Sequence, residues 1–111
     1  MKHAINKETL IDMLTEKKAV KILDVRKKDA YKADARVIPG AEWHDPQTVE
    51  TWSDQLPEDR LIVTYCVKGG PVSQSVKDQL SQKGLNTVFL EGGLKSWVEG
   101  NHPVQETTPP E

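Results

Sequence analysis

The stretch that decides the fold is Leu61-Ile-Val-Thr-Tyr-Cys-Val-Lys-Gly-Gly-Pro-Val-Ser-Gln-Ser-Val76. Its apolar beginning, residues 61–63, is typical of a buried parallel strand. Gly69 and Gly70 then allow a tight turn, and Pro71 suits the first position of a helix because it lacks the N–H that would be unpaired there. The stretch therefore predicts a strand, a tight loop and a helix.

The only cysteine of the chain, Cys66, lies where this strand ends. In open α/β sheets, ligands bind at the carboxyl ends of the strands. The N–H groups of a tight loop and the positive end of the following helix favour an anion there, so they favour the thiolate. Cys66 is therefore a candidate nucleophile. The alternative is a small buried hydrophobic residue, which is the more common role of a lone cysteine.

The rest of the chain alternates between strand-like runs and helical spacing of hydrophobic residues. We predict strands at residues 2–5, 20–25, 41–43 and 87–90, and helices after Asn6, weakly over 27–35, and over 48–56, 71–83 and 94–98. Such alternation requires parallel crossover connections. We therefore predict an α/β fold, a three-layer sandwich in which helices flank a central parallel sheet.

The composition limits the size of the protein and the classes of its partners. A chain of 111 residues with 36% hydrophobic residues suits a single domain, which we place at residues 1–101. Residues 102–111 are polar and contain three prolines, so we predict a disordered tail. The net charge of −2, from 15 basic and 17 acidic residues, gives no electrostatic footprint for nucleic acid or an anionic membrane.

The sequence also argues against several other arrangements. One cysteine excludes an intrachain disulfide, and no apolar run approaches the roughly 20 residues of a membrane helix. Residues 1–20 lack the apolar segment of a signal peptide, so we expect a cytoplasmic protein, and we expect it to be monomeric. The three histidines lie far apart in the sequence, so we expect no metal, and we expect no cofactor.

Four short blocks of this sequence resemble the single-domain rhodanese-like sulfurtransferases, and they occur in the order found in that family. The blocks are Ile22-Leu-Asp-Val-Arg26, Ile38-Pro-Gly-Ala41, Tyr65-Cys-Val-Lys-Gly-Gly70 and Leu90-Glu-Gly-Gly-Leu-Lys-Ser-Trp97. The resemblance implies a sheet of five strands. It also implies that Cys66 takes a sulfane sulfur from a small donor such as thiosulfate, holds it as a persulfide, and passes it to a thiol, a sulfur-carrier protein or, in an assay, cyanide.

The same resemblance assigns roles around the cysteine. It places Lys68 over the oxyanion end of the donor, and it implies that Asp24 and Arg26 close their strand beneath the loop. We expect this pair to support the loop as an ion pair or anchor, and the alternative is direct contact with the substrate. The remaining residues expected to bind substrate belong to the loop and the start of the helix: Val67, Gly69, Gly70, Pro71 and Val72.

The sequence departs from the family pattern at three places. Val37 stands where many members have a histidine, Ala30 where some thiosulfate-using members have an arginine, and the loop has Gly70 or Pro71 where many members carry an arginine. These departures leave open a second function, a rhodanese-type module that binds or senses a partner, or carries sulfur, with little turnover.

A cysteine phosphatase or arsenate reductase is a third reading of the loop. Those enzymes need an arginine at the position of Val72 to grip a tetrahedral anion with its bidentate guanidinium. A valine can neither donate a hydrogen bond nor neutralise the anion. The sequence therefore disfavours this reading.

Overall fold

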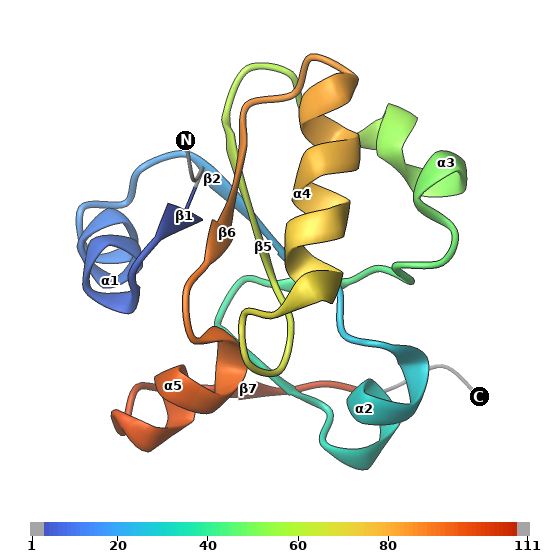
Figure 1. Cartoon of the computed structure of the whole chain (residues 1–111). Coiled ribbons are helices and arrows are strands. Elements are labelled where there is room, and N and C mark those ends of the chain that lie inside the picture. The colour runs from blue at the N-terminus through green and yellow to red at the C-terminus, as the bar shows by residue number, and fades with distance from the viewer. Residues whose placement is uncertain (1–3, 109–111) are drawn as a thin grey trace.

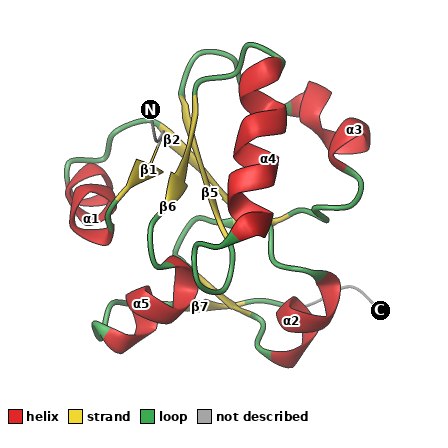
Figure 2. Ribbon diagram, in the orientation of Figure 1, coloured by secondary structure: helices red, strands yellow, loops and turns green. Residues whose placement is uncertain are grey.

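The computed structural model describes residues 4–108, which form a five-stranded parallel sheet between helices (Figure 1; Figure 2). This confirms the predicted α/β sandwich and the number of strands in its sheet. The elements in chain order are β1 (Ala4–Ile5), α1 (Lys7–Thr15), β2 (Val20–Asp24), α2 (Lys28–Ala33), β3 (Arg36–Val37), β4 (Glu42–Trp43), α3 (Val49–Trp52), the 3-10 helix η1 (Ser53–Gln55), β5 (Leu61–Tyr65), α4 (Pro71–Gln82), β6 (Thr87–Leu90), α5 (Gly93–Glu99) and β7 (Gln105–Glu106).

The strand order β1-β6-β5-β2-β4 places β5 in the middle of the sheet. β5 pairs with β2 along its whole length, from Val20 opposite Leu61 to Asp24 opposite Tyr65, and with β6 on its other side. The chain leaves β2 toward the β4 edge and leaves β5 toward the β6 edge, so the connections diverge between these two strands. Such a divergence is the usual position of a ligand site in an open α/β sheet, and Cys66 follows β5 at this point.

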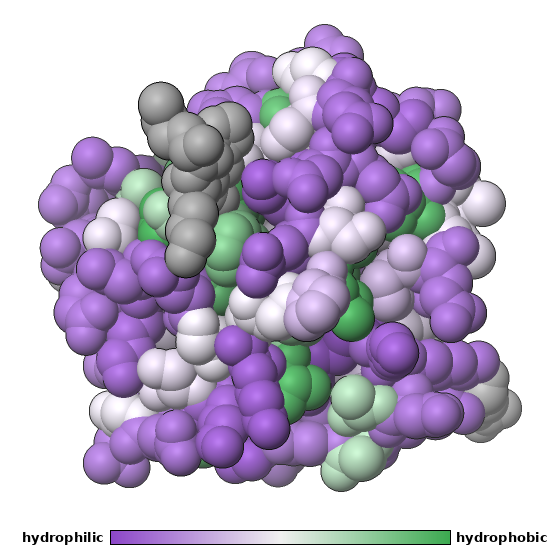
Figure 3. Space-filling view, in the orientation of Figure 1, coloured by the Kyte–Doolittle hydropathy of each residue, from purple (hydrophilic) through white to green (hydrophobic). Residues whose placement is uncertain are grey.

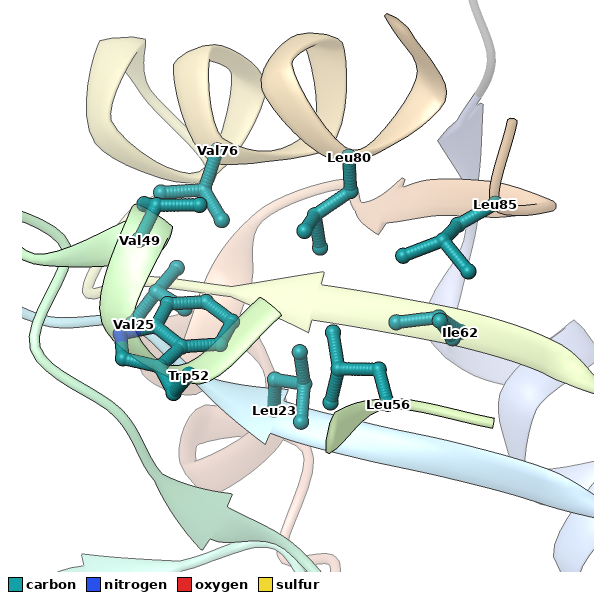
Figure 4. Packing of buried hydrophobic residues seen from close by; sticks show 9 residues of the cluster. All are labelled: Leu23, Val25, Val49, Trp52, Leu56, Ile62, Val76, Leu80 and Leu85. Carbon is teal, nitrogen blue, oxygen red and sulfur yellow. The ribbon is translucent and has the colours of Figure 1, made fainter. Parts of the chain in front are cut away.

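The two faces of the sheet carry separate hydrophobic clusters, because side chains alternate along each strand. On β5, Ile62 belongs to the cluster beneath α3 and α4 (Figure 4), whereas Val63 and Tyr65 belong to the cluster beneath α1 and α5. The first cluster comprises Leu23, Val25, Val49, Trp52, Leu56, Ile62, Val76, Leu80 and Leu85. The second comprises Leu10, Ile22, Ile38, Val63, Tyr65, Leu90, Leu94 and Trp97.

Two helix ends form as their local sequence predicts. Asn6 caps α1, with its side-chain oxygen accepting a hydrogen bond from the Thr9 N–H at 2.8 Å. At the end of α4, Gly84 has a φ of +86°, and the N–H of Leu85 donates to Leu80 O at 3.2 Å, which is the Schellman arrangement.

The prediction of one continuous helix over residues 48–56 is wrong. α3 ends at Trp52 and the chain continues as the 3-10 helix η1. The indole N–H of Trp52 donates to Asp45 O at 2.9 Å and Leu56 is buried in the first cluster. The tighter turn brings both large side chains onto the sheet, so Trp52 and Leu56 are core residues.

The disordered tail predicted from residue 102 is wrong for residues 102–108. β7 pairs antiparallel with β3, and Figure 1 shows it running between α5 and α2. The Trp97 indole N–H donates to Pro103 O at 2.7 Å, and the Thr107 hydroxyl donates to Ala35 O at 2.6 Å. The buried indole and the unpaired edge of β3 each need a partner, and this segment supplies both. Residues 109–111 lie outside the described part of the chain.

Across residues 4–108, the helices are all too short or too polar to cross a lipid bilayer.

Candidate active site

Cys66 lies directly after β5 and is 6% exposed. The alternation of side chains along β5 puts it on the face of Ile62 and Thr64, which is the face covered by α4. A hydrogen bond from the end of β2 fixes this strand end, because the Val25 N–H donates to the carbonyl oxygen of Tyr65, the residue before Cys66, at 2.9 Å. The sulfur is therefore held between the sheet and the first turn of α4.

The N-terminus of α5 supports the loop after Cys66 from the opposite side. The N–H of Leu94 donates to Cys66 O and the N–H of Lys95 donates to Val67 O, both at 2.9 Å. In a trans peptide the N–H points away from the preceding carbonyl, and the described chain contains no cis peptide. The N–H groups of Val67 and Lys68 therefore point away from α5, toward the face of the sheet that holds α4 and the sulfur.

A run of backbone donors around Cys66 is free to bind an anion. Within residues 4–108, these N–H groups donate no hydrogen bond to another protein atom: Val67, Lys68, Gly69, Gly70, Val72 and Ser73. Backbone N–H groups in folded proteins are ordinarily paired with protein or water. Those that point to the α4 face, together with the positive end of the twelve-residue helix α4, can donate hydrogen bonds to a charged sulfur or an oxyanion.

Two glycines allow the loop and α5 to come this close. Gly69 has a φ of +72°, and a Cβ built on it would lie 2.7 Å from the Gly92 nitrogen. Gly93 has a φ of +58°, and its Cβ would lie 2.7 Å from Val67 O and would also collide with Cys66 O. Any larger residue at either position would push the loop off the helix. The Gly92-Gly93 pair therefore serves the cysteine loop as well as the start of α5.

Ser73 contacts the sulfur and was missed in the sequence analysis. Its Oγ lies 3.2 Å from Cys66 Sγ, and the residue is fully buried in the first turn of α4. In the sequence, the spacing of Val72, Val76 and Leu80 by four residues predicts that they form the buried stripe of this helix. The structure leaves Val72 half-buried and uses Ser73 in its place, at i, i+3 and i+7 with Val76 and Leu80. That spacing was the available signal.

Asp24 and Arg26 form a buried pair beside the loop, 0% and 2% exposed. The guanidinium binds both carboxylate oxygens through Nε at 2.9 and 3.0 Å, and Nη2 reaches Asp24 Oδ2 at 2.7 Å. The remaining guanidinium contacts go to Asp34 O at 2.7 Å and Arg36 O at 3.0 Å. Arg26 thus ties the end of β2 to the segment between α2 and β3.

Tyr65 links the central strand to the block that begins at Ile38. Its hydroxyl oxygen accepts a hydrogen bond from the Ile38 N–H at 3.1 Å. Burial, reinforced by the nearby Asp24 carboxylate, raises the pKa of Tyr65 far above its usual value, so the hydroxyl stays neutral. Tyr65 thus has a structural role next to Cys66.

The surface beside the loop holds the other predicted residues. Lys68 is exposed and Val67 is the exposed large hydrophobic residue of the described chain, at 40%. Val67 borders a groove of about 410 Å³, and Figure 3 shows hydrophobic patches over α2 and between α2 and α5 on a mostly hydrophilic face. Pro71 and Val72 line a smaller hollow of about 250 Å³ on the other side, next to Lys27.

The two remaining departures from the family pattern have different surroundings. Ala30 lines the groove next to Val67, so a longer side chain there would project along the loop. Val37 is fully buried in β3 and lies opposite Gln105 of β7. A histidine at this position would have to fit beneath residues 102–108.

Comparison with known proteins gives a consistent result. A family model described as a rhodanese-like domain matches residues 6–100. The tRNA sulfurtransferase of Desulfurococcus amylolyticus is 35% identical over 79 residues, which cover 71% of this chain and only 15% of that protein. A rhodanese-related protein from Thermoplasma volcanium is 29% identical with a TM-score of 0.77, covering 93% of this chain and 97% of that one. A rhodanese-like domain protein from Staphylococcus aureus is 26% identical with a TM-score of 0.81, covering 97% and 100%.

Proposed function

The chain belongs to the rhodanese-like domain family, and from this premise we propose that it is a sulfurtransferase in which Cys66 carries the sulfur. The observation that carries the proposal is the set of unpaired N–H groups around a cysteine at the end of the central strand. Such donors stabilise a negatively charged sulfur in a site largely shielded from water.

The first half-reaction loads the cysteine. The Cys66 thiolate attacks the outer sulfur of thiosulfate, a bond forms between the two sulfurs, and the sulfur–sulfur bond of thiosulfate breaks with its electron pair leaving on sulfite. The loop N–H groups stabilise the resulting persulfide anion. Lys68, exposed on the loop, attracts and orients the sulfonate oxygens.

The second half-reaction returns the cysteine to its starting form. An acceptor thiolate attacks the outer sulfur of the Cys66 persulfide, and Cys66 leaves as a thiolate. The acceptor keeps the outer sulfur as its own persulfide anion, so the total charge is the same before and after the step. Asp24 and Arg26 act in neither step directly, because their mutual contacts and the carbonyls of Asp34 and Arg36 occupy the guanidinium.

Intact mass after incubation with thiosulfate tests the proposal. We expect the protein to gain one sulfur atom and to lose it on addition of cyanide or a thiol. The variant Cys66→Ser should gain none, because a serine hydroxyl is hardly ionised at neutral pH and forms no persulfide. No gain by the parent protein from thiosulfate or from a small persulfide donor would contradict the assignment.

One observation favours a second candidate, a sulfur carrier or sensor with little turnover. The loop ends in Pro71 and Val72, so it lacks a guanidinium that could bind the oxyanion of a donor. A carrier would accept sulfur from a protein or small persulfide but would load slowly from thiosulfate. The same mass measurement with both donors therefore separates the two candidates.

A further inference from the structure

We propose that the Ser73 hydroxyl stabilises Cys66 Sγ whenever this atom carries negative charge, first as the attacking thiolate and again as the leaving group when the persulfide is discharged. The second role rests on the sulfur transfer proposed above. The first role concerns the resting thiol alone and does not depend on any sulfur donor.

The position of the hydroxyl is fixed by its surroundings. Ser73 is fully buried, and its Oγ lies 3.2 Å from Cys66 Sγ. Its backbone carbonyl accepts a hydrogen bond from the buried hydroxyl of Thr64 at 3.0 Å, which attaches the first turn of α4 to β5. Since Thr64 stands two residues before Cys66 on the same face of the strand, this bond sets the distance between hydroxyl and sulfur.

The hydrogen bonds around Ser73 can reverse when the thiol ionises. In the neutral form the thiol of Cys66 donates to Ser73 Oγ, and the serine hydroxyl donates to Gly70 O at a long 3.4 Å. A thiolate has no proton to donate, but a hydroxyl can rotate about its C–O bond and donate instead. A hydrogen bond to an ionised acceptor is about twice as strong as one between neutral groups. The exchange therefore favours the thiolate.

The same bond assists discharge of the persulfide. When an acceptor thiolate attacks the outer sulfur, the bond between that sulfur and Sγ breaks and its electron pair moves to Sγ of Cys66. The outer sulfur departs on the acceptor. A leaving thiolate departs faster when it is better stabilised, so a hydroxyl that donates to Sγ should speed this step.

The rate of alkylation by iodoacetamide as a function of pH tests the first role, because only the thiolate reacts. We expect Ser73→Ala to move the midpoint of this profile upward by roughly 0.5–1 pH unit, because the variant loses a hydrogen bond in both forms and the bond to the thiolate is about twice as strong as the bond made by the thiol. Ser81→Ala is the matched control. It removes a hydroxyl from the same helix, and Ser81 Oγ is buried without a hydrogen-bond partner among residues 4–108.

Other charges near the loop stay constant in these variants. They include Lys68 on the loop, Lys27 beside Pro71 and Val72, the Asp24–Arg26 pair at the end of β2, Lys95 in the first turn of α5, and the residues Asp34, Arg36 and Glu99 of the groove next to Val67, while the first turn of α4 carries no acidic residue. A difference in midpoint between the Ser73 and Ser81 variants therefore reports the effect of the Ser73 hydroxyl. The pair Ser73→Thr and Ser73→Val, equal in shape, repeats the comparison if the alanine variant does not fold.

The outcomes separate this inference from the proposed function. An alanine midpoint within about 0.3 pH units of the parent, or equal midpoints for Ser73→Thr and Ser73→Val, would overturn the role of the hydroxyl. A shifted midpoint with a slower discharge of preloaded persulfide supports both roles. A shifted midpoint in a protein that accepts no sulfur from any donor supports the first role and overturns the proposed function.

Discussion

Replacing Arg26 by methionine should destabilise the protein far more than the same replacement at Arg36. Both arginines belong to an Asp-x-Arg unit in which the guanidinium binds the carboxylate two residues earlier, with Nη2–Oδ2 distances of 2.7 and 2.8 Å. The side chains of the Asp24–Arg26 pair are 0% and 2% exposed, whereas those of the Asp34–Arg36 pair are 39% and 43% exposed. The chain thus holds a buried and an exposed version of one interaction.

The expected magnitudes follow from this difference in burial. Arg26→Met leaves the Asp24 carboxylate buried without its cationic partner, and it also unpairs the carbonyls of Asp34 and Arg36. Removing one partner of a buried pair costs about 3–5 kcal/mol, out of a total stability of about 5–15 kcal/mol. Arg36→Met should cost about 0–1 kcal/mol, because water solvates the carboxylate left behind.

Urea unfolding at pH 7, followed by tryptophan fluorescence, measures both losses, provided that the denaturant slopes of the variants agree. Adding Asp24→Asn to Arg26→Met should recover part of the loss, because the unpaired charge is then gone. Equal losses for Arg26→Met and Arg36→Met would refute the claim that burial sets the strength of this pair.

Three further predictions concern the loop and the pH dependence of stability. Gly93→Ala should slow sulfur loading at least about tenfold, because its φ is +58° and the new Cβ would displace Val67 O, whereas Gly84→Ala, with a φ of +86° and open space, should not. Lys68→Ala should raise KM for thiosulfate more than it lowers kcat, reducing kcat/KM about five- to thirty-fold, with less effect at high salt or for an uncharged donor. Burial lowers the pKa of His44, so the unfolded chain takes up its proton at a higher pH. Unfolding free energy should therefore fall as pH drops below about 6.5, and His44→Gln should flatten this fall.

Local sequence patterns were sufficient for the elements that depend on neighbouring residues. The strand before Cys66, the proline at the start of α4 and the Schellman end at Gly84 all lie where periodicity and backbone preference placed them. The candidate nucleophile could be found in the same way, since its position at the end of a buried strand is itself a local feature.

Two predictions failed for different reasons: in one, the local spacing was compatible with two buried faces, and in the other, contacts with distant segments decided the structure. Spacing by four favoured Val72 as a buried residue of α4, but spacing by three placed Ser73 on the same face, and only packing against β5 selected the serine. The polar composition of residues 102–108 indicated a free tail, but pairing with β3 and the indole of Trp97 holds that segment in place.

The sequence alone was sufficient to identify candidate residues for the chemistry, because strand ends, glycine turns and helix starts can be predicted from the spacing of nearby residues. Tertiary structure decided what surrounds the sulfur. The N–H groups of Leu94 and Lys95 reach the carbonyls of Cys66 and Val67 across almost thirty residues of sequence. Arg26 reaches Asp34 O and Arg36 O through a turn of the chain that no periodicity specifies. Such contacts form only when separate elements pack together. A buried polar group then bonds to whichever donor or acceptor the fold places beside it, and that partner can be far away in the sequence.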